Sequence, residues 1–419
     1  MKKAVLLSWI FAYSGIAISE DASYSIEEVT SFRNEWTLEN WDSGGPLSRY
    51  IFLNMPEFWN HSIISRSGPM NELSSNLRVD VTEFITTTDA GNIPLGDYVA
   101  SSTVNGAIVL HHGKIVFEAY PQMRSEDSHV YMSVSKVFAS TLIAILEDRG
   151  LIDVSKGVGN YLPSLKGTAW SSVAIRDVLD MASGINCLEQ TDGAYSNPEH
   201  CFYQHDAAMG FREVTGKMID NPFEHIATLR SHRPAGEAFE YTSVNTFLLG
   251  WLAETISGRP YADLISTEIW KIIGAESDGI IAAPRKGVPI ASAGISSTLR
   301  DMARFGLLFT PSGRKSSKPL ISDAYLAKIQ QGGRPEIFNV VGVTSKRLVD
   351  GEMPRHNSYQ WDFVMNDGDF FKGGFAGQGL YISPSRDLVI AFFGMFDEDQ
   401  VSHQMQRIAR QLAKSNLFN

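Results

Sequence analysis

The stretch Tyr131-Met132-Ser133-Val134-Ser135-Lys136, which runs into the apolar segment VFASTLIAIL at residues 137–146, decides how this chain is interpreted. The apolar run predicts a helix that opens at this stretch and ends at Gly150, a suitable C-terminal cap. Residues three apart share one face of a helix, so the hydroxyl of Ser133 and the amine of Lys136 would lie side by side. Free N–H groups at the helix N-terminus can bind a developing anion. The stretch therefore suggests a serine nucleophile with its base.

The Ser-x-x-Lys spacing by itself is a weak signal. It occurs twice, at Ser133–Lys136 and Ser312–Lys315, which is no more often than chance allows in a chain this rich in serine and lysine. The second copy lies in the polar stretch PSGRKSSK and has no apolar run to form a helix. The sequence context favours Ser133. Other hydrolase and metal motifs, G-x-S-x-G, H-E-x-x-H and C-x-x-C, are absent from the sequence.

Length and composition indicate a folded protein of enzyme size. The chain has 419 residues, of which 43% are hydrophobic and 20% charged, and length alone suggests two or three domains. The formal net charge of −11 provides no electrostatic footprint for nucleic acid, so we expect no nucleic-acid partner.

The N-terminus predicts export. Residues 1–19 read MKKAVLLSWIFAYSGIAIS, with two lysines, an apolar stretch and small residues before a cleavage point after Ser19. A transmembrane anchor is the less favoured alternative, because the stretch is short and contains Ser8, Ser14 and Gly15. We expect a periplasmic or secreted protein with no membrane span after cleavage of the signal peptide.

The chain has two cysteines, Cys187 and Cys201. In an oxidising compartment a disulfide closing this short loop would add about 3 kcal/mol of stability, and two free buried thiols are the alternative. His200 and His205 flank Cys201, but their irregular spacing favours a loop with a disulfide over a metal site. We expect no metal and no other cofactor.

Strand patterns at both ends of the chain predict the fold class. Residues 106–120 (GAIVLHHGKIVFEAY) read as a hairpin, and residues 358–374 and 379–394 read as strands with turns between them. Helical patterns lie between. We therefore predict an α/β (α+β) fold, with a mainly antiparallel sheet flanked by helices and an inserted, mostly helical domain. The predicted segments are a signal peptide at 1–19, an irregular N-terminal extension at 20–75, a mixed α/β domain at 76–150 and 287–419, and a mostly helical domain at 151–286.

Two further motifs follow the serine in the sequence. Tyr241-Thr242-Ser243 precedes an apolar helix, and Lys372-Gly373-Gly374-Phe375 precedes the last strand pair. Taken singly, they are also consistent with a core tyrosine beside a helix cap and with a glycine-rich turn. In the order Ser-x-x-Lys, Tyr-x-Ser, Lys-Gly-Gly, the chain resembles the serine β-lactamase and penicillin-binding protein superfamily, from about residue 105 to residue 393.

Within that superfamily the chain is most similar to the class C-type branch, which includes esterases, D-amino-acid peptidases and the 6-aminohexanoate-dimer (nylon oligomer) hydrolases. The last group is the most similar, because it also carries Tyr-x-Ser where β-lactamases carry Tyr-x-Asn. Its loop also resembles residues 194–206 here, AYSNPEHCFYQHD, at Tyr195, Pro198, His205 and Asp206.

The resemblance implies roles for individual residues. Ser133 would be acylated, Lys136 would accept its proton, Tyr241 would carry that proton to the leaving group, and Lys372 would tune the potential of the site. It also implies an oxyanion hole and a set of substrate contacts. The oxyanion hole would be formed by the backbone N–H groups of Ser133 and Phe375, and the substrate would be held by Tyr195, Asp206, Ser243 and Gly374.

Three functions remain open at this point. The leading one is hydrolysis of a small amide, ester or short peptide. The second is a β-lactamase or D-Ala-D-Ala carboxypeptidase. Ser243 and Gly373 weigh against it, because they replace the Asn and Thr or Ser that contact a β-lactam in that family. The third is a non-catalytic penicillin-binding-like module, which the intact motif positions disfavour. The sequence indicates no oligomeric state.

Overall fold

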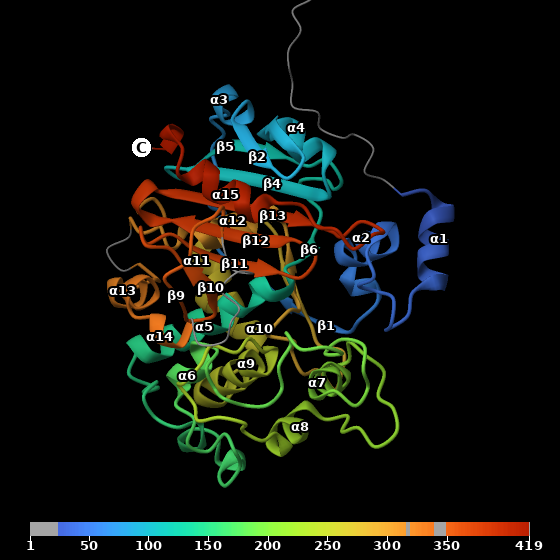
Figure 1. Ribbon diagram of the computed structural model, residues 1–419, viewed down its shortest axis with the longest axis vertical. Helices are drawn as coiled ribbons and strands as arrows, with labels where there is room; N and C mark the ends of the chain where they lie inside the picture. The colour runs from blue at the N-terminus through green and yellow to red at the C-terminus, as the bar shows by residue number, and fades with distance from the viewer. Residues whose placement is uncertain (1–23, 316–318, 339–348, 419) are drawn as a thin grey trace, which may run out of the picture.

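The computed structural model describes residues 24–315, 319–338 and 349–418, so the predicted signal peptide at 1–19 lies outside the described residues. Figure 1 shows a large sheet in the upper half of the molecule and a group of helices, from α6 to α9, in the lower half. The nucleophile stretch and α5 (Lys136–Asp148) lie between the two halves.

The large sheet has seven strands in the order β5-β4-β13-β12-β11-β10-β9. Every neighbouring pair is antiparallel, which confirms the predicted sheet type. The predicted hairpin is β4 and β5, and β4 pairs with β13, so strands from both ends of the chain meet in one sheet. The strands are β4 (Val104–His111), β5 (Lys114–Ala119), β9 (His356–Ser358), β10 (Trp361–Val364), β11 (Phe370–Gly374), β12 (Gln378–Ser383) and β13 (Leu388–Gly394).

Helices cover both faces of this sheet. Side chains of a strand alternate between the two faces of its sheet, and β13 is apolar on both faces. Val389 and Ala391 belong to the core that includes α12 (Leu299–Leu307). Ile390 belongs to the core on the opposite face, which includes α15 (Met405–Ala413). A sheet buried on both faces gives β11 and its lysine a rigid support.

The N-terminal extension is more regular than predicted. It contains α1 (Ile26–Glu35), α2 (Gly45–Leu53), the 3₁₀ turn η1 (Met55–Glu57) and β1 (His61–Ile64). A capping box explains where α1 begins, because the Ser25 hydroxyl accepts from the Glu28 N–H while the Glu28 carboxylate accepts from the Ser25 N–H.

Two smaller antiparallel sheets complete the β structure. One has four strands in the order β1-β7-β8-β6, which ties the N-terminal extension to the middle of the chain, and the other has two. Their remaining strands are β6 (His129–Val130), β7 (Gly279–Ala282), β8 (Ile295–Ser297), β2 (Ile85–Thr88) and β3 (Gly91–Pro94).

The other helices are mostly short. The segment that carries the two cysteines contains α7, whose N-cap is the side chain of His200. The helices are α3 (Val79–Thr82), α4 (Leu95–Ser101), α6 (Ile175–Leu179), α7 (Cys201–Met209), α8 (Pro222–Thr228), α9 (Ser243–Ser257), α10 (Tyr261–Leu264), a π-helical turn (Ile265–Trp270), α11 (Lys271–Ile273), α13 (Asp323–Gln331) and α14 (Pro335–Phe338). The 3₁₀ turns are η2 (Met132–Ser135), η3 (Val158–Asn160), η4 (Pro163–Leu165), η7 (Pro384–Arg386) and η8 (Asn416–Phe418). Across the described residues, no helix combines the length and apolarity that a membrane crossing requires.

Candidate active site

Ser133 lies in η2, one turn before α5 begins at Lys136, so the predicted helix opens with a 3₁₀ turn. The Lys136 amine donates a hydrogen bond of 3.1 Å to the Ser133 hydroxyl. Lys136 is fully buried, whereas Ser133 is only partly buried. The second Ser-x-x-Lys copy lies in a turn where the Ser312 hydroxyl donates to Asp387, so only the first copy forms the predicted pair.

The Lys136 amine has two other acceptors, which sequence reasoning did not assign. It donates to the Ser243 hydroxyl at 2.6 Å and to the Ser292 carbonyl at 3.0 Å. Ser243, predicted to contact substrate, is therefore a direct partner of the lysine. These contacts hold the amine 3.1 Å from the Ser133 hydroxyl, within reach of the proton that a base would take.

Burial lowers the pKa of Lys136 from its ordinary value to about 8. The Glu189 carboxylate opposes this shift by favouring the charged amine, and the Lys372 ammonium adds to it. A lysine with this pKa is partly neutral near neutral pH. It can therefore accept a proton, which an ordinary lysine cannot.

Tyr241 lies between the two lysines of the site. Lys372 donates a 3.1 Å hydrogen bond to the Tyr241 hydroxyl, and the Lys136 amine lies 5.3 Å from the centre of its ring. Burial holds the pKa of Tyr241 well above its ordinary value, and nearby carboxylates raise it further, whereas a hydrogen bond with Ser133 lowers it. Tyr241 is therefore a neutral hydroxyl, and Lys136 is the better base of the two.

Lys372 is fully buried on β11 and pairs with a carboxylate that the sequence did not reveal. Asp362, on the neighbouring strand β10, accepts from the Lys372 amine and, at 2.9 Å, from the Gly373 N–H. Burial lowers the pKa of Lys372, and Asp362 opposes that shift. A charged residue between the apolar neighbours Trp361 and Phe363 was the available signal in the sequence.

Gly374 brings the end of β11 against the nucleophile turn. A β-carbon at this position would lie 2.6 Å from the carbonyl oxygen of Tyr131, which only glycine avoids. Phe375 follows directly, and its carbonyl accepts from the Gln378 side chain at 2.8 Å. The structure therefore places the segment of Phe375 beside η2. The substrate contact predicted for Gly374 stays a prediction.

Tyr195 and Asp206 lie on the segment that carries the disulfide. The Tyr195 hydroxyl donates to Glu189 at 2.9 Å, and its ring centre lies 6.2 Å from that of Phe375. Burial raises the pKa of Asp206, on α7, to about 8, and Arg212 opposes that shift. Within the described part of the chain, no hydrogen bond to the Asp206 side chain is seen, and the residue is partly exposed.

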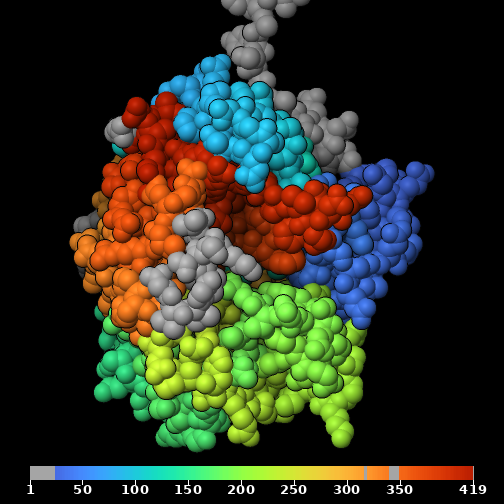
Figure 2. Space-filling model, viewed as in Figure 1, coloured from blue at the N-terminus to red at the C-terminus, as the bar shows by residue number. Residues whose placement is uncertain are grey.

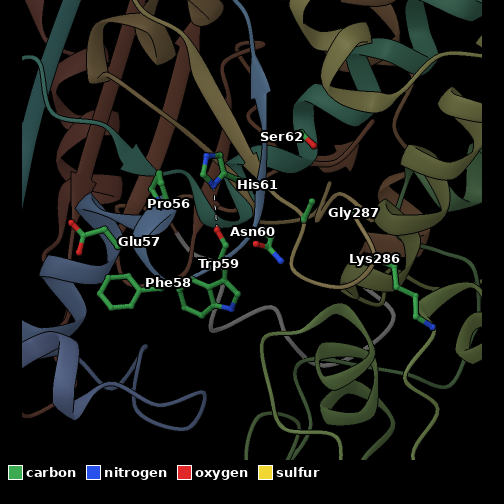
Figure 3. Close-up of a pocket in the computed structure, with 10 residues that line it drawn as sticks. Pro56, Glu57, Phe58, Trp59, Asn60, His61, Ser62, Lys286 and Gly287 are labelled. Atoms are coloured by element: carbon green, nitrogen blue, oxygen red, sulfur yellow. Dashed lines mark hydrogen bonds between the residues drawn. The ribbon is translucent and has the colours of Figure 1, made fainter.

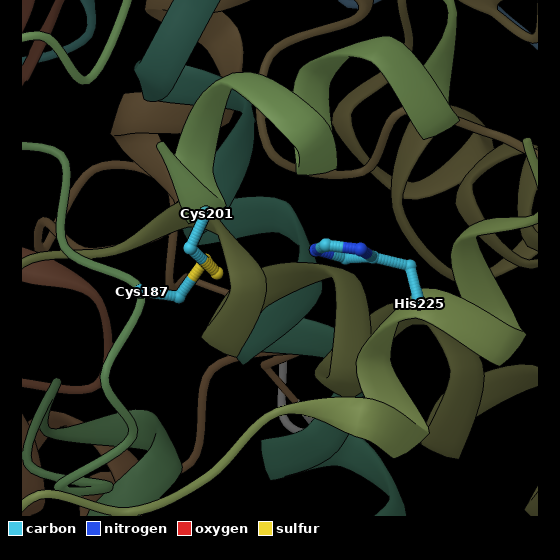
Figure 4. Close-up of side chains that lie close together, drawn as sticks. All are labelled: Cys187, Cys201 and His225. Atoms are coloured by element: carbon cyan, nitrogen blue, oxygen red, sulfur yellow. A yellow bond between two sulfur atoms is a disulfide. The ribbon is translucent and has the colours of Figure 1, made fainter. Parts of the chain in front are cut away.

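Cys187 and Cys201 form the predicted disulfide, which lies beside His225 (Figure 4). The sulfur atoms and a ring nitrogen of His225 lie within 4.8 Å of one another. Metal binding by cysteine needs thiolates, and these sulfurs are bonded to each other. The disulfide instead joins the loop after Cys187 to the start of α7.

Two hollows on the surface differ in position. Figure 2 shows a recess between the C-terminal segments, drawn in red, and the segment near residue 200, drawn in green. A separate open pocket of about 600 Å³ is lined by residues 56–62 together with Ala283, Lys286 and Gly287 (Figure 3). None of these residues is among those predicted for the site.

One cluster brings together Ser133, Lys136, Tyr241 and Lys372, and both of its lysines are fully buried. The beta-lactamase family model matches residues 97–414, so the chain belongs to the beta-lactamase family. It is a hydrolase of the β-lactamase fold, as the resemblance in the sequence implied.

Individual relatives point in the same direction. The chain is 28% identical over 372 residues to the 6-aminohexanoate-dimer hydrolase of Paenarthrobacter ureafaciens, covering 88% of this chain and 90% of that protein. A proposed 6-aminohexanoate-dimer hydrolase from Bacillus anthracis superposes with a TM-score of 0.75 at 24% identity, covering 91% and 96% of the two chains. A class C β-lactamase from Rhodobacter sphaeroides superposes with a TM-score of 0.52 at 20% sequence identity, covering 75% of this chain and 96% of that one. The two structures share the fold with this chain.

Proposed function

We propose that this chain is an exported serine hydrolase that cleaves a small amide or ester through an acyl-enzyme on Ser133. The observation that carries the proposal is the hydrogen bond from Lys136 to Ser133. Tyr241, which accepts a hydrogen bond from Lys372, completes the cluster. The extensive similarity to a 6-aminohexanoate-dimer hydrolase supports an amide or ester substrate. Export rests on the predicted signal peptide.

The acylation step uses Lys136 as base. Its neutral amine takes the proton of the Ser133 hydroxyl while the serine oxygen bonds to the substrate carbonyl carbon. The backbone N–H groups of Ser133 and Phe375 would bind the resulting oxyanion, a contribution worth about 3 kcal/mol. The bond to the leaving group then breaks, and Tyr241 donates the proton that the leaving amine or alkoxide needs. Lys136 returns its own proton to Tyr241.

Deacylation reverses these roles with water in place of the leaving group. Water loses a proton to the Tyr241–Lys136 pair, and its oxygen bonds to the ester carbonyl carbon. The bond between that carbon and the Ser133 oxygen then breaks, Ser133 takes the proton back, and the acid product leaves. Tyr195 and Asp206 would line the leaving-group side, where a bound ammonium group would favour the ionised form of Asp206.

Two substitutions test the proposal. Ser133→Ala should abolish turnover of p-nitrophenyl esters, short ω-amino-acid amides and D-amino-acid peptides, and Tyr241→Phe should lower the acylation rate at least about 100-fold. The assay is product release by the folded variants, with circular dichroism as the folding control. Rates near those of the wild type in either variant would show that the site is assigned wrongly.

The same panel separates the other functions. Rapid nitrocefin hydrolysis with no turnover of amides or esters would identify a β-lactamase instead. A folded protein that forms no adduct with a fluorophosphonate at Ser133, as seen by mass spectrometry, would be a binding module.

The pH dependence follows from Lys136. The base must be neutral, so kcat/KM should rise with pH and level off above the pKa of about 8. A profile that is flat between pH 6 and pH 9 would contradict Lys136 as the base.

A further inference from the structure

Glu189 is a buried carboxylate that no sequence motif indicated. It is 8% exposed, and both of its oxygens accept hydrogen bonds: one from the backbone N–H of Ser243 and one from the Tyr195 hydroxyl. Within the described residues it has no ion-pair partner. Burying a carboxylate costs free energy unless hydrogen bonds and nearby positive charge compensate for its lost hydration.

The chain around Glu189 is joined to the Tyr241 motif at three points. The Thr242 hydroxyl donates to the Cys187 carbonyl at 2.5 Å, and the Glu189 N–H donates to the Tyr241 carbonyl at 3.3 Å. The third is the bond from Ser243 N–H to the Glu189 carboxylate. Glu189 therefore has a fixed position relative to the residues that follow Tyr241.

Ser243 connects Glu189 to the nucleophile. Its N–H is held by Glu189, and its hydroxyl accepts from the Lys136 amine, which in turn donates to Ser133. A shift of the Ser243 backbone would therefore move one of the acceptors that orient the Lys136 amine.

Several charged groups surround Lys136. Glu189 favours the charged amine most strongly, and Lys372 disfavours it. The groups that face the amine are Glu189 from the loop, Lys372 from β11, Asp362 from β10, Asp206 and His205 from α7, and the Tyr241 ring before α9. Among them Glu189 differs from Asp362, whose charge is already paired with Lys372.

We propose that Glu189 is a positioning residue for the base: through Ser243 it orients the Lys136 amine, and its charge balances that of Lys372 across the site. This inference rests on the proposed function, since it assigns Lys136 the part of the base. The negative charge of Glu189 thereby stabilises the protonated Lys136 amine that forms when it takes the Ser133 proton. Without that charge the amine would be neutral over a wider pH range but a weaker base.

The test is the pH profile of fluorophosphonate labelling at Ser133, because this reaction needs no knowledge of the natural substrate. Glu189→Gln keeps the side-chain shape and an acceptor for the Ser243 N–H while removing the charge. Loss of a nearby negative charge disfavours the ammonium form of Lys136. The rising limb of the labelling rate should therefore move to lower pH by about one unit, the usual effect of one close opposite charge. The plateau rate should fall several-fold.

Glu240→Gln is the matched control. Glu240 is also 8% exposed, but its carboxylate is paired with His232 at 2.8 Å and Arg233 at 3.0 Å. Removing the Glu240 charge should leave the rising limb of the labelling profile at the pH where the wild type has it.

The outcomes separate the two proposals. If the wild type is not labelled, or Ser133→Ala is labelled equally, the proposed function fails. If labelling depends on Ser133 but Glu189→Gln keeps the wild-type limb and only lowers the plateau, Glu189 is merely structural and the inference is overturned. A variant that fails to fold is replaced by Glu189→Asp, for which we expect the limb to stay near the wild-type position because the charge remains.

Discussion

At the scale of single residues, the backbone around Ser133 is constrained from both sides. Met132, directly before it, has a φ of 47°, a left-handed conformation that costs a non-glycine residue about 1–2 kcal/mol. On the other side, Gly374 lets β11 approach the Tyr131 carbonyl. The position of Ser133 thus depends on one residue in a strained backbone conformation and on one glycine without a side chain.

Gly374→Ala tests this close approach. The new β-carbon would lie 2.6 Å from the Tyr131 oxygen, so β11 and the nucleophile turn must move apart. We expect a loss of about 1–3 kcal/mol of stability, as for other overpacked sites, together with loss of esterase activity. Thermal unfolding and ester hydrolysis are the measurements.

Gly373→Ala is the control from the same strand. Its β-carbon would lie 3.1 Å from the Phe371 ring, which can shift more easily than a backbone oxygen. Equal losses in both variants would contradict a special role for the contact between Gly374 and Tyr131.

At the scale of elements, the site is assembled from segments that are far apart in the sequence. Tyr241 precedes α9, Lys372 is on β11 and its partner Asp362 is on β10. The loop after Cys187 supplies Glu189 and is joined by the disulfide to α7. The pairing of β10 with β11 and the disulfide therefore both serve to hold charges around Lys136.

Removing the disulfide should weaken that loop. The bridge joins residues 14 apart, so replacing Cys187 and Cys201 together by serine should cost about 3 kcal/mol in the chain-entropy account. Activity should also fall, because Glu189 lies two residues from Cys187. The melting temperature of the double variant and its ester hydrolysis rate test this.

Reduced wild-type protein should behave like the double-serine variant. Thiol titration of the unfolded, unreduced chain should find no free thiol, and two titrating thiols would refute the bridge.

At the scale of the whole molecule, the N-terminal extension packs against the segment that follows α7. The indole N–H groups of Trp41 and Trp59 donate to the carbonyls of Phe211 and Gly210, just after α7. Arg212 extends this contact by pairing with Asp42 at 2.6 Å. The extension on the right of Figure 1 is therefore part of the folded body.

Asp42→Ala should destabilise the protein markedly. Arg212 has a side chain only 6% exposed, so the variant leaves a buried cation without its carboxylate, at a cost of about 3–5 kcal/mol. Glu126→Ala is the control, because Glu126 and its partner Arg124 are largely exposed and their separation is 3.7 Å; it should cost less than about 1 kcal/mol. Urea unfolding of both variants provides the comparison, and similar losses would contradict the role given to Asp42.

The sequence by itself determined the local features. Two short apolar runs around the turn at residues 111–114 defined the hairpin of β4 and β5, and the apolar run after Ser133 defined α5, because these patterns act between near neighbours. The three-residue spacing of Ser133 and Lys136, together with the apolar run that follows, predicted that hydroxyl and amine would meet. The resemblance to a known family then indicated Tyr241 and Lys372.

Only the tertiary structure decided which groups surround Lys136. Glu189 sits in the polar run NCLEQTDG and resembles any solvated loop acid, and Asp362 is one charge in an apolar strand. Glu189 matters because it is buried and bonds to Ser243, which is 54 residues away in the sequence. Asp362 matters because it pairs with the buried Lys372 on the neighbouring strand and its charge acts on Lys136. Such contacts depend on how elements pack, and no local period in the sequence records that packing.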